Sequence, residues 1–147
     1  TQGQYKKVWI DINRTAHIGC ASEAYREQHR MVRSCFEAVV ENLKPGQNTA
    51  AICEKVESSL AKDLATPGKL LLIIHSIGAF PLENPMMFPS TGLDATKGFD
   101  IKSSMILSFD CLYFGSKLGP SHMENVFEIT PHGAQSLYRY PLELIEI

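Results

Sequence analysis

The 147-residue sequence lacks the features that mark several specialised classes of protein. Its apolar runs are short: Leu70 to Ile74 falls far below the roughly 20 residues that a membrane helix needs. It has no basic stripe, and its formal net charge is −2, so nucleic acid is not an expected partner. We also expect no secretory signal, and we find no internal repeat or low-complexity linker. Binding to a membrane or to nucleic acid is therefore not predicted.

Cysteine is scarce and unpatterned. The four cysteines have no CxxC spacing, so a site built on paired thiols is not expected. Their apolar surroundings predict reduced core residues of a cytoplasmic protein. Apolar residues make up 44% of the sequence and charged residues 20%, a balance typical of a globular chain. The length suits one domain, residues 1–147, with a core of its own.

The N-terminal pattern predicts two strands joined by a turn. Residues 5–12 alternate, with Asp11 on one face, and residues 17–25 can return antiparallel, with Gly19 as a bulge. Pairing would let Asp11 and Glu23 face each other, and two such carboxylates need a proton or a cation between them. The alternative is that Asp11 belongs to a turn and Glu23 starts a helix.

Two helices are predicted next, near residues 27–43 and 48–64. Apolar residues recur at three- and four-residue steps in both segments. Lys44-Pro45-Gly46 ends the first helix, Asn48 or Thr49 caps the second, and Thr66-Pro67-Gly68 closes it. We assign these helices to the scaffold.

The rest of the chain reads mainly as strands. They are expected at residues 69–75, 105–114, 122–130 and 136–147, with a loop at 85–98. Met86, Met87 and Phe88 either pack under that loop or line a pocket. Such strands predict an α+β fold, in which a curved antiparallel sheet of about five strands carries both helices on its outer face.

Glu124 shares a strand face with Val126. It is either a solvated residue of an edge strand or a carboxylate that points into a site. The stretch Glu124-Asn-Val-Phe-Glu-Ile-Thr-Pro-His-Gly resembles the last metal-ligand strand of the pita-bread hydrolases. That family contains methionine aminopeptidase, proline dipeptidase, aminopeptidase P and creatinase. Asp11-Ile-Asn, Lys44-Pro45-Gly46 and His75-Ser-Ile-Gly are similar to other segments of the family, in the same order.

The resemblance implies a pita-bread fold and a set of functional residues. The implied ligands of two divalent ions (Mn, Co, Zn or Fe) are Asp11, Glu23, His75, Asp110 and Glu124. Asp110 or Glu83 would move the proton, and His75 is a further candidate for acid–base chemistry. The implied activity is that of an Xaa-Pro dipeptidase or aminopeptidase, in which the metal site activates water to attack a small peptide.

Several residues depart from the family pattern. Glu23 stands where the family has aspartate, Asp110 where it has glutamate, and Leu82 where it has a substrate-contacting histidine. Ser103-Ser104 replaces the usual Pro-Gly before the ligand strand. These changes predict weakened or altered peptide hydrolysis. One alternative is a creatinase-like enzyme that acts without metal on a small amide or guanidino compound. The other is a non-catalytic relative that binds a protein partner.

The resemblance also predicts a missing partner. The sequence resembles the C-terminal portion of the pita-bread catalytic domain and lacks most of its first half. We therefore expect a second chain, or the separate N-terminal half, to dock against residues 5–12, with a homodimer as the alternative.

Overall fold

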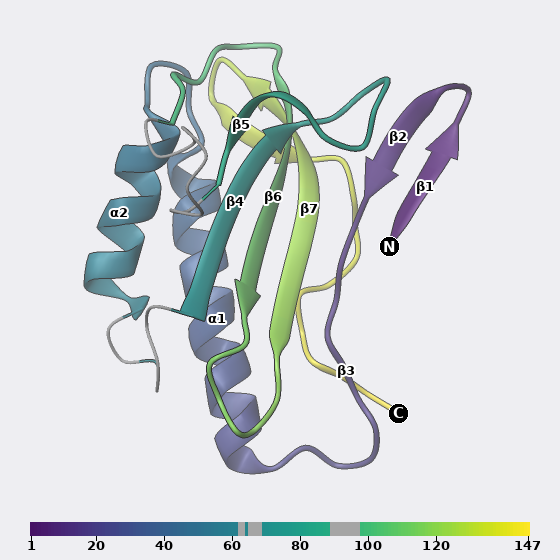
Figure 1. The fold of residues 1–147 in the computed structure, drawn as a ribbon, viewed down its shortest axis with the longest axis vertical. Helices are drawn as coiled ribbons and strands as arrows, with labels where there is room; N and C mark the ends of the chain where they lie inside the picture. The colour runs from purple at the N-terminus through teal and green to yellow at the C-terminus, as the bar shows by residue number, and fades with distance from the viewer. Residues whose placement is uncertain (62–63, 65–68, 89–97) are drawn as a thin grey trace.

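The computed structural model describes residues 1–61, 64, 69–88 and 98–147. A five-stranded antiparallel sheet forms its centre, in the order β5-β4-β6-β7-β8. Its strands are β4 (Leu70–Ser76), β5 (Glu83–Met87), β6 (Ile106–Tyr113), β7 (Ser121–Thr130) and β8 (Gly133–Ser136). Helices α1 (Glu23–Asn42) and α2 (Thr49–Ser59) cover one face, while a hairpin of β1 (Gln2–Tyr5) and β2 (Val8–Asp11) stands off the other (Figure 1). The predicted α+β layers are therefore confirmed.

The core lies between the helices and the sheet. The Phe36 ring of α1 stacks on Phe109 of β6, with ring centroids 5.0 Å apart. Strand β6 alternates, so Leu107, Phe109 and Cys111 are fully buried on the helix side. Ser108 and Asp110 consequently point to the opposite face, and this alternation puts the polar residues of the sheet on the face without helices.

The strand predicted at residues 5–12 is correct only for β2 (Val8–Asp11), because a tight turn at Lys6 and Lys7 pairs β2 back onto β1. Lys6 and Lys7 both have positive φ, 48° and 67°, as a two-residue turn between twisted strands requires. The prediction missed it because lysine is not a typical residue for such a turn. Several hydrogen bonds join the hairpin region to the sheet and the turn after β4: Trp9 N–H donates to the Gly78 carbonyl over 2.8 Å, and Asn13 and Glu124 exchange main-chain hydrogen bonds of 3.1 and 3.4 Å.

The predicted strand at residues 17–25 is wrong. Only Ala16–His17 forms a strand, β3, and it pairs in parallel with β9 (Ile145–Glu146). The side chain of Ser22 accepts a 3.2 Å hydrogen bond from Tyr25 N–H and caps α1, which begins at Glu23. A serine cap with an acidic residue in the first turn stabilises a helix start, and this local preference prevails over the alternation.

The C-terminal predictions are correct for some strands and wrong for others. Part of the predicted loop at 85–98 is strand β5, with Pro85 at the edge of the sheet, where proline costs no ladder bond. Residues 136–147 form no single strand: β8 ends at Ser136, and only the two residues of β9 are extended later. The predicted helix end at Thr66-Pro67-Gly68 lies outside the described residues. In the described ranges, no helix is long and apolar enough to cross a membrane.

Candidate active site

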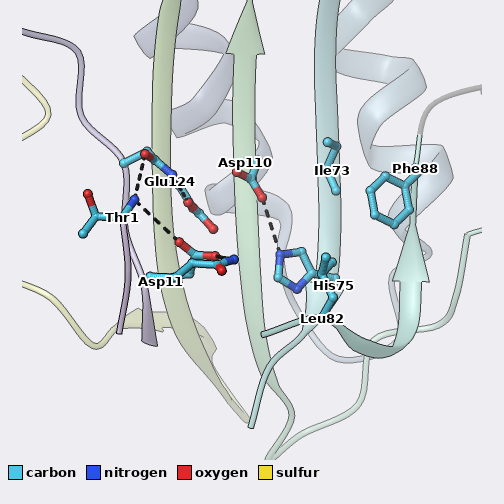
Figure 2. Close-up of a pocket in the computed structure, with 10 residues that line it drawn as sticks. Thr1, Asp11, Ile73, His75, Leu82, Phe88, Asp110 and Glu124 are labelled. Carbon is cyan, nitrogen blue, oxygen red and sulfur yellow. Dashed lines mark hydrogen bonds and ion pairs between the residues drawn. The ribbon is translucent and has the colours of Figure 1, made fainter. Parts of the chain in front are cut away.

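A pocket of about 380 Å³ opens on the face of the sheet that the helices do not cover. Strands β4, β6 and β7 form its floor, and the chain around β2 forms one wall (Figure 2). The lining residues are Thr1, Gln2, Asp11, Asn13, Ile73, His75, Leu82, Phe88, Asp110 and Glu124. One side of the pocket is therefore acidic, and the other is apolar.

Strand register brings three of the predicted site residues together. Asp110 lies directly opposite Glu124 on the antiparallel pair β6–β7. His75 lies opposite Ser108 on β4–β6, which places it diagonal to Asp110 on the same face. One ligand atom from each of His75, Asp110 and Glu124 lies within 4.8 Å of the others.

Glu124 is only 1% exposed, yet it carries a carboxyl group. Its Oε1 accepts a 2.9 Å hydrogen bond from the Ser108 hydroxyl, and its Oε2 accepts one from the Asn13 amide. Burial and the nearby charges of Asp110 and Asp11 raise the pKa of Glu124 to about 8. Without a cation, the protonated form is therefore favoured at neutral pH.

Asp110 lies between two imidazole rings. His122 Nε2 is 2.9 Å from its Oδ1, and His75 Nε2 is 3.5 Å from its Oδ2. Burial by itself would raise the pKa of Asp110, but the contacts with His122 and His75 outweigh it and lower the pKa. Asp110 is therefore held as the ionised carboxylate.

The tautomer of His75 determines whether its Nε2 presents a proton or a lone pair to Asp110. Its Nδ1 is 3.0 Å from the Ser76 carbonyl, which only accepts hydrogen bonds, so Nδ1 carries a proton. Its Nε2 then faces Asp110 Oδ2 with a lone pair, unless a second proton or a cation lies between them. Burial would lower the pKa of His75, but Asp110 and the Ser76 carbonyl raise it overall.

These distances fit a divalent ion. Two ligands about 2.1 Å from one ion in a tetrahedral arrangement are about 3.4 Å apart. The 3.5 Å between His75 Nε2 and Asp110 Oδ2 is close to that value and longer than an ordinary hydrogen bond. Metal-bound histidine usually donates its other N–H to a carbonyl or carboxylate, as His75 does here. One histidine and two carboxylates suit ions such as Zn²⁺ or Mn²⁺.

Asp11 adds a second acidic group to the pocket. It is 4% exposed, and its Oδ2 accepts a 2.6 Å hydrogen bond from the Gln2 amide. Among the described residues, its buried Oδ1 has no hydrogen-bond partner; the Thr1 nitrogen is 3.9 Å away. A buried carboxylate oxygen without a donor is costly, and a nearby cation would relieve that cost.

Two predicted site residues lie outside the pocket lining. The Glu23 side chain is 71% exposed on the first turn of α1, where it pairs with Arg30 at 2.6 Å. The helix start at Ser22 turns it away from the sheet, so it cannot share an ion with Asp11. Glu83 Oε1 accepts a 2.7 Å hydrogen bond from Phe80 N–H and thus holds the turn before β5. The geometry therefore gives neither residue the ligand or proton-transfer role that the sequence predicts.

Several residues of the site were not identified from the sequence, and three of them contact Asp110 or Glu124. His122 precedes Glu124 by two residues on the same face of β7, a spacing from which its position could have been inferred. Asn13 and Ser108 gave no such signal, since their contacts with Glu124 depend on strand pairing. Of the apolar residues left open, Met87 packs into the core and Phe88 lines the pocket.

A comparison with protein families identifies the chain. The model of metallopeptidase family M24 matches residues 1–131. The chain belongs to this family. The resemblance to the pita-bread hydrolases is thus confirmed, and the sheet with its two helices is that fold. No curated protein matches the chain in a sequence search.

Solved structures of M24-like fold superpose closely on the chain. Dipeptidase PepE from Mycobacterium ulcerans has a TM-score of 0.84 at 21% identity, over 99% of this chain and 38% of its own. X-Pro aminopeptidase from Thermotoga maritima MSB8 has a TM-score of 0.84 at 15% identity, over 99% of this chain and 40% of its own. The N-terminal domain of FACT complex subunit SPT16 from Cicer arietinum has a TM-score of 0.77 at 18% identity, over 92% of this chain and 33% of its own.

These likenesses establish the fold alone, because the identities are low. The chain spans between 33% and 40% of the length of the three solved chains. Two of them are named as peptidases, and the third is named as a domain of a complex subunit. The family and the fold are therefore established, and the activity has to be argued from the site.

Proposed function

We propose that the chain carries the reaction centre of a hydrolase for the C–N bond of small peptides, of the Xaa-Pro dipeptidase or aminopeptidase type. The observation that carries this proposal is the convergence of His75, Asp110 and Glu124 on one pocket of an M24 chain. Such a trio would hold one divalent ion. The two-ion site implied by the family motif would need another ligand beside Asp11, and Glu23 does not supply it.

The bound ion, Asp110 and the apolar lining of the pocket would have different roles in the reaction. The bound ion would acidify a water molecule and polarise the scissile carbonyl. Asp110, kept ionised by its two histidines, would accept a proton from the attacking water and pass it to the leaving amine. Ile73, Leu82 and Phe88 hold an apolar part of the substrate and exclude water from that side. The pKa of Glu124 is raised mainly by burial and then by the charges of Asp110 and Asp11, and a bound cation would lower it.

We expect the peptidase activity to be weak beside that of an ordinary prolidase. Leu82 lines the pocket and is 47% exposed, but its side chain has no hydrogen-bond donor for the reacting carbonyl. Loss of one such donor typically slows a reaction about 10²–10³-fold. The test is to load the purified protein with Mn²⁺ or Co²⁺, measure bound metal, and compare its rate on Xaa-Pro dipeptides with that of a family prolidase.

We expect one bound equivalent of metal and slow, metal-dependent cleavage. Cleavage at the rate of the family prolidase would contradict the role given to Leu82. A protein that binds no metal would contradict the metal-dependent proposal. We propose in addition that the protein is cytoplasmic, because its four cysteines are free thiols.

A creatinase-like, metal-independent hydrolase is the second candidate. The observation that favours it is that both oxygens of Asp110 and both of Glu124 already face protein groups. A second proton on His75 would then replace the ion between Nε2 and Asp110, in keeping with its raised pKa. Turnover of small amide and guanidino compounds in the presence of a chelator would support this candidate and exclude the first.

We also propose that a second polypeptide segment covers the β1–β2 hairpin. Tyr5, Val8 and Ile10 are 69%, 55% and 45% exposed, and β1 pairs only with β2 among the described strands. An unpaired edge beside exposed apolar residues is typical of an interface. The segment would be the N-terminal half of the domain, with a homodimer as the alternative. Sedimentation of the purified 147-residue chain tests this: a stable monomer that does not associate would contradict it.

A further inference from the structure

We propose that His122 is a positioning residue of this site, which holds one oxygen of Asp110 and leaves the other for the ion. The inference rests on the proposed metal-dependent function. It assigns a role to a residue that lies next to, but not in, the His75, Asp110 and Glu124 trio. Asp110 has two chemically equivalent oxygens, and His122 makes them different.

The geometry of three neighbouring strands carries the inference. Asp110 stands on the central strand β6, with Leu112 two residues later facing His122 on β7. His75 comes from β4 on the other side, opposite Ser108. The two imidazoles thus reach Asp110 from opposite strands and opposite ends: His122 at Oδ1 over 2.9 Å, and His75 at Oδ2 over 3.5 Å.

The two distances indicate different roles. The 2.9 Å contact is an ordinary hydrogen bond, and because an ionised carboxylate only accepts, His122 Nε2–H is the donor. The 3.5 Å contact has the separation of two ligands of one ion. With Oδ1 held by His122, Asp110 presents Oδ2 toward His75. His122 therefore favours coordination through a single oxygen and opposes rotation of the carboxylate.

The ring of His122 is not needed to hold its strand in place. Thr15 already anchors the main chain there: its Oγ1 accepts from His122 N–H over 2.7 Å and donates to the His122 carbonyl over 3.1 Å. The side chain is 28% exposed, whereas that of His75 is 3% exposed. A substitution at His122 should therefore leave the fold intact, and its effect should appear at Asp110.

The test compares His122→Leu, which removes the donor, with His122→Gln, whose amide N–H can reach the position of Nε2. His132→Leu, at an exposed position on the turn between β7 and β8, is the matched control. Binding of Mn²⁺ to each purified protein is measured by calorimetry, together with kcat and KM on an Xaa-Pro dipeptide and the ion-free Tm. Partners of metal ligands typically change affinity about 10–100-fold.

We expect His122→Leu to weaken Mn²⁺ binding by about 10–100-fold and to lower kcat more than it raises KM, with an unchanged ion-free Tm. His122→Gln should recover most of both losses. Wild-type affinity in His122→Leu would overturn the inference. Equal losses in both variants would also overturn it, because they would make His122 a ligand.

Failure of the proposed function has a separate signature. If the wild-type protein binds no metal, the metal-dependent proposal fails, and crystal structures of the ion-free proteins decide about His122. One orientation of the Asp110 carboxylate in wild type, lost in His122→Leu and kept in His122→Gln, supports the positioning role. An unchanged orientation in His122→Leu contradicts it.

Discussion

Replacement of Glu124 with glutamine is expected to abolish tight binding of a divalent ion and the hydrolysis that depends on it. Glutamine keeps the size of the side chain and one accepting oxygen, which can take the hydrogen bond from Asn13 while its NH2 group donates to the Ser108 hydroxyl, but it removes the negative charge that balances the ion. Loss of one of three protein ligands should lower Mn²⁺ affinity by at least about 100-fold. Calorimetric titration and the dipeptide assay measure both effects.

The same substitution is expected to stabilise the ion-free protein at alkaline pH. The pKa of Glu124 is raised from 4.5 in the unfolded chain to about 8 in the folded one. Between these values the folded state holds a proton that the unfolded state has released, so the free energy of unfolding falls as pH rises from about 4.5 to about 8. The loss is on the order of 3–5 kcal/mol, and Glu124→Gln should not show it.

Urea unfolding of both proteins at pH 5 and pH 9, with chelator present, measures the difference. Glu23→Gln is the matched control, because Glu23 pairs with Arg30 on the surface and does not line the pocket. It should leave Mn²⁺ affinity unchanged. Loss of affinity in Glu23→Gln, or wild-type affinity in Glu124→Gln, would contradict the proposed ligand set.

Replacement of Arg14 with alanine is expected to loosen the site and the C-terminal segment together. The Arg14 Nη1 donates to the carbonyls of Asn13 and Glu124 over 2.7 and 2.8 Å. Its Nε and Nη2 donate to the carbonyls of Pro141 and Tyr140 over 2.6 and 3.0 Å. One guanidinium thus ties the main chain of Glu124 to residues 140–141, and Asn125 Oδ1 accepts a further 2.7 Å hydrogen bond from Nη2.

We expect Arg14→Ala to lower the free energy of unfolding by on the order of 3 kcal/mol, since four charge-assisted hydrogen bonds to carbonyls are lost, two of them part-buried. Amide exchange over residues 138–147 should become faster, and Mn²⁺ affinity should fall because Glu124 is less well held. Lysine should not restore these properties, because a single ammonium group cannot make a forked set of bonds.

Arg30→Ala is the control for Arg14, because the ion pairs of Arg30 with Glu23 and Glu27 lie on the surface. Such pairs contribute little to stability. Amide exchange at residues 138–147 is the decisive measurement. If its rate in Arg14→Ala equals that of the wild type, other contacts hold the C-terminal segment.

Local patterns were enough to predict much of the scaffold. The spacing of Val32, Phe36 and Val39 predicted α1, and Asn48, one of two predicted caps, does cap α2 by accepting from Ala50 N–H over 3.0 Å. Alternation and β-branched residues located β4, β6 and β7 to within a few residues. These patterns depend on residues a few positions apart, so they can be recognised from the sequence alone.

Failures of prediction occurred where a helix cap or a contact with a distant segment prevailed over the alternation of apolar and polar residues. Residues 17–25 alternate well enough for a strand, but Ser22 caps α1 there, and β3 finds its partner in β9, more than a hundred residues later. Residues 136–147 likewise alternate in part, yet contacts with Arg14 and with Arg26 of α1 hold them as a largely irregular segment.

The sequence by itself determined the family, the layers of the fold and the identity of His75, Asp110 and Glu124 as candidates. Only the tertiary structure decided that Glu23 lies outside the pocket and that His122 reaches Asp110. It also decided that Ser108 and Asn13 hold the two oxygens of Glu124. The physical reason is that strand register and the start of a helix set the direction of each side chain, and a shift of one residue turns a side chain to the opposite face.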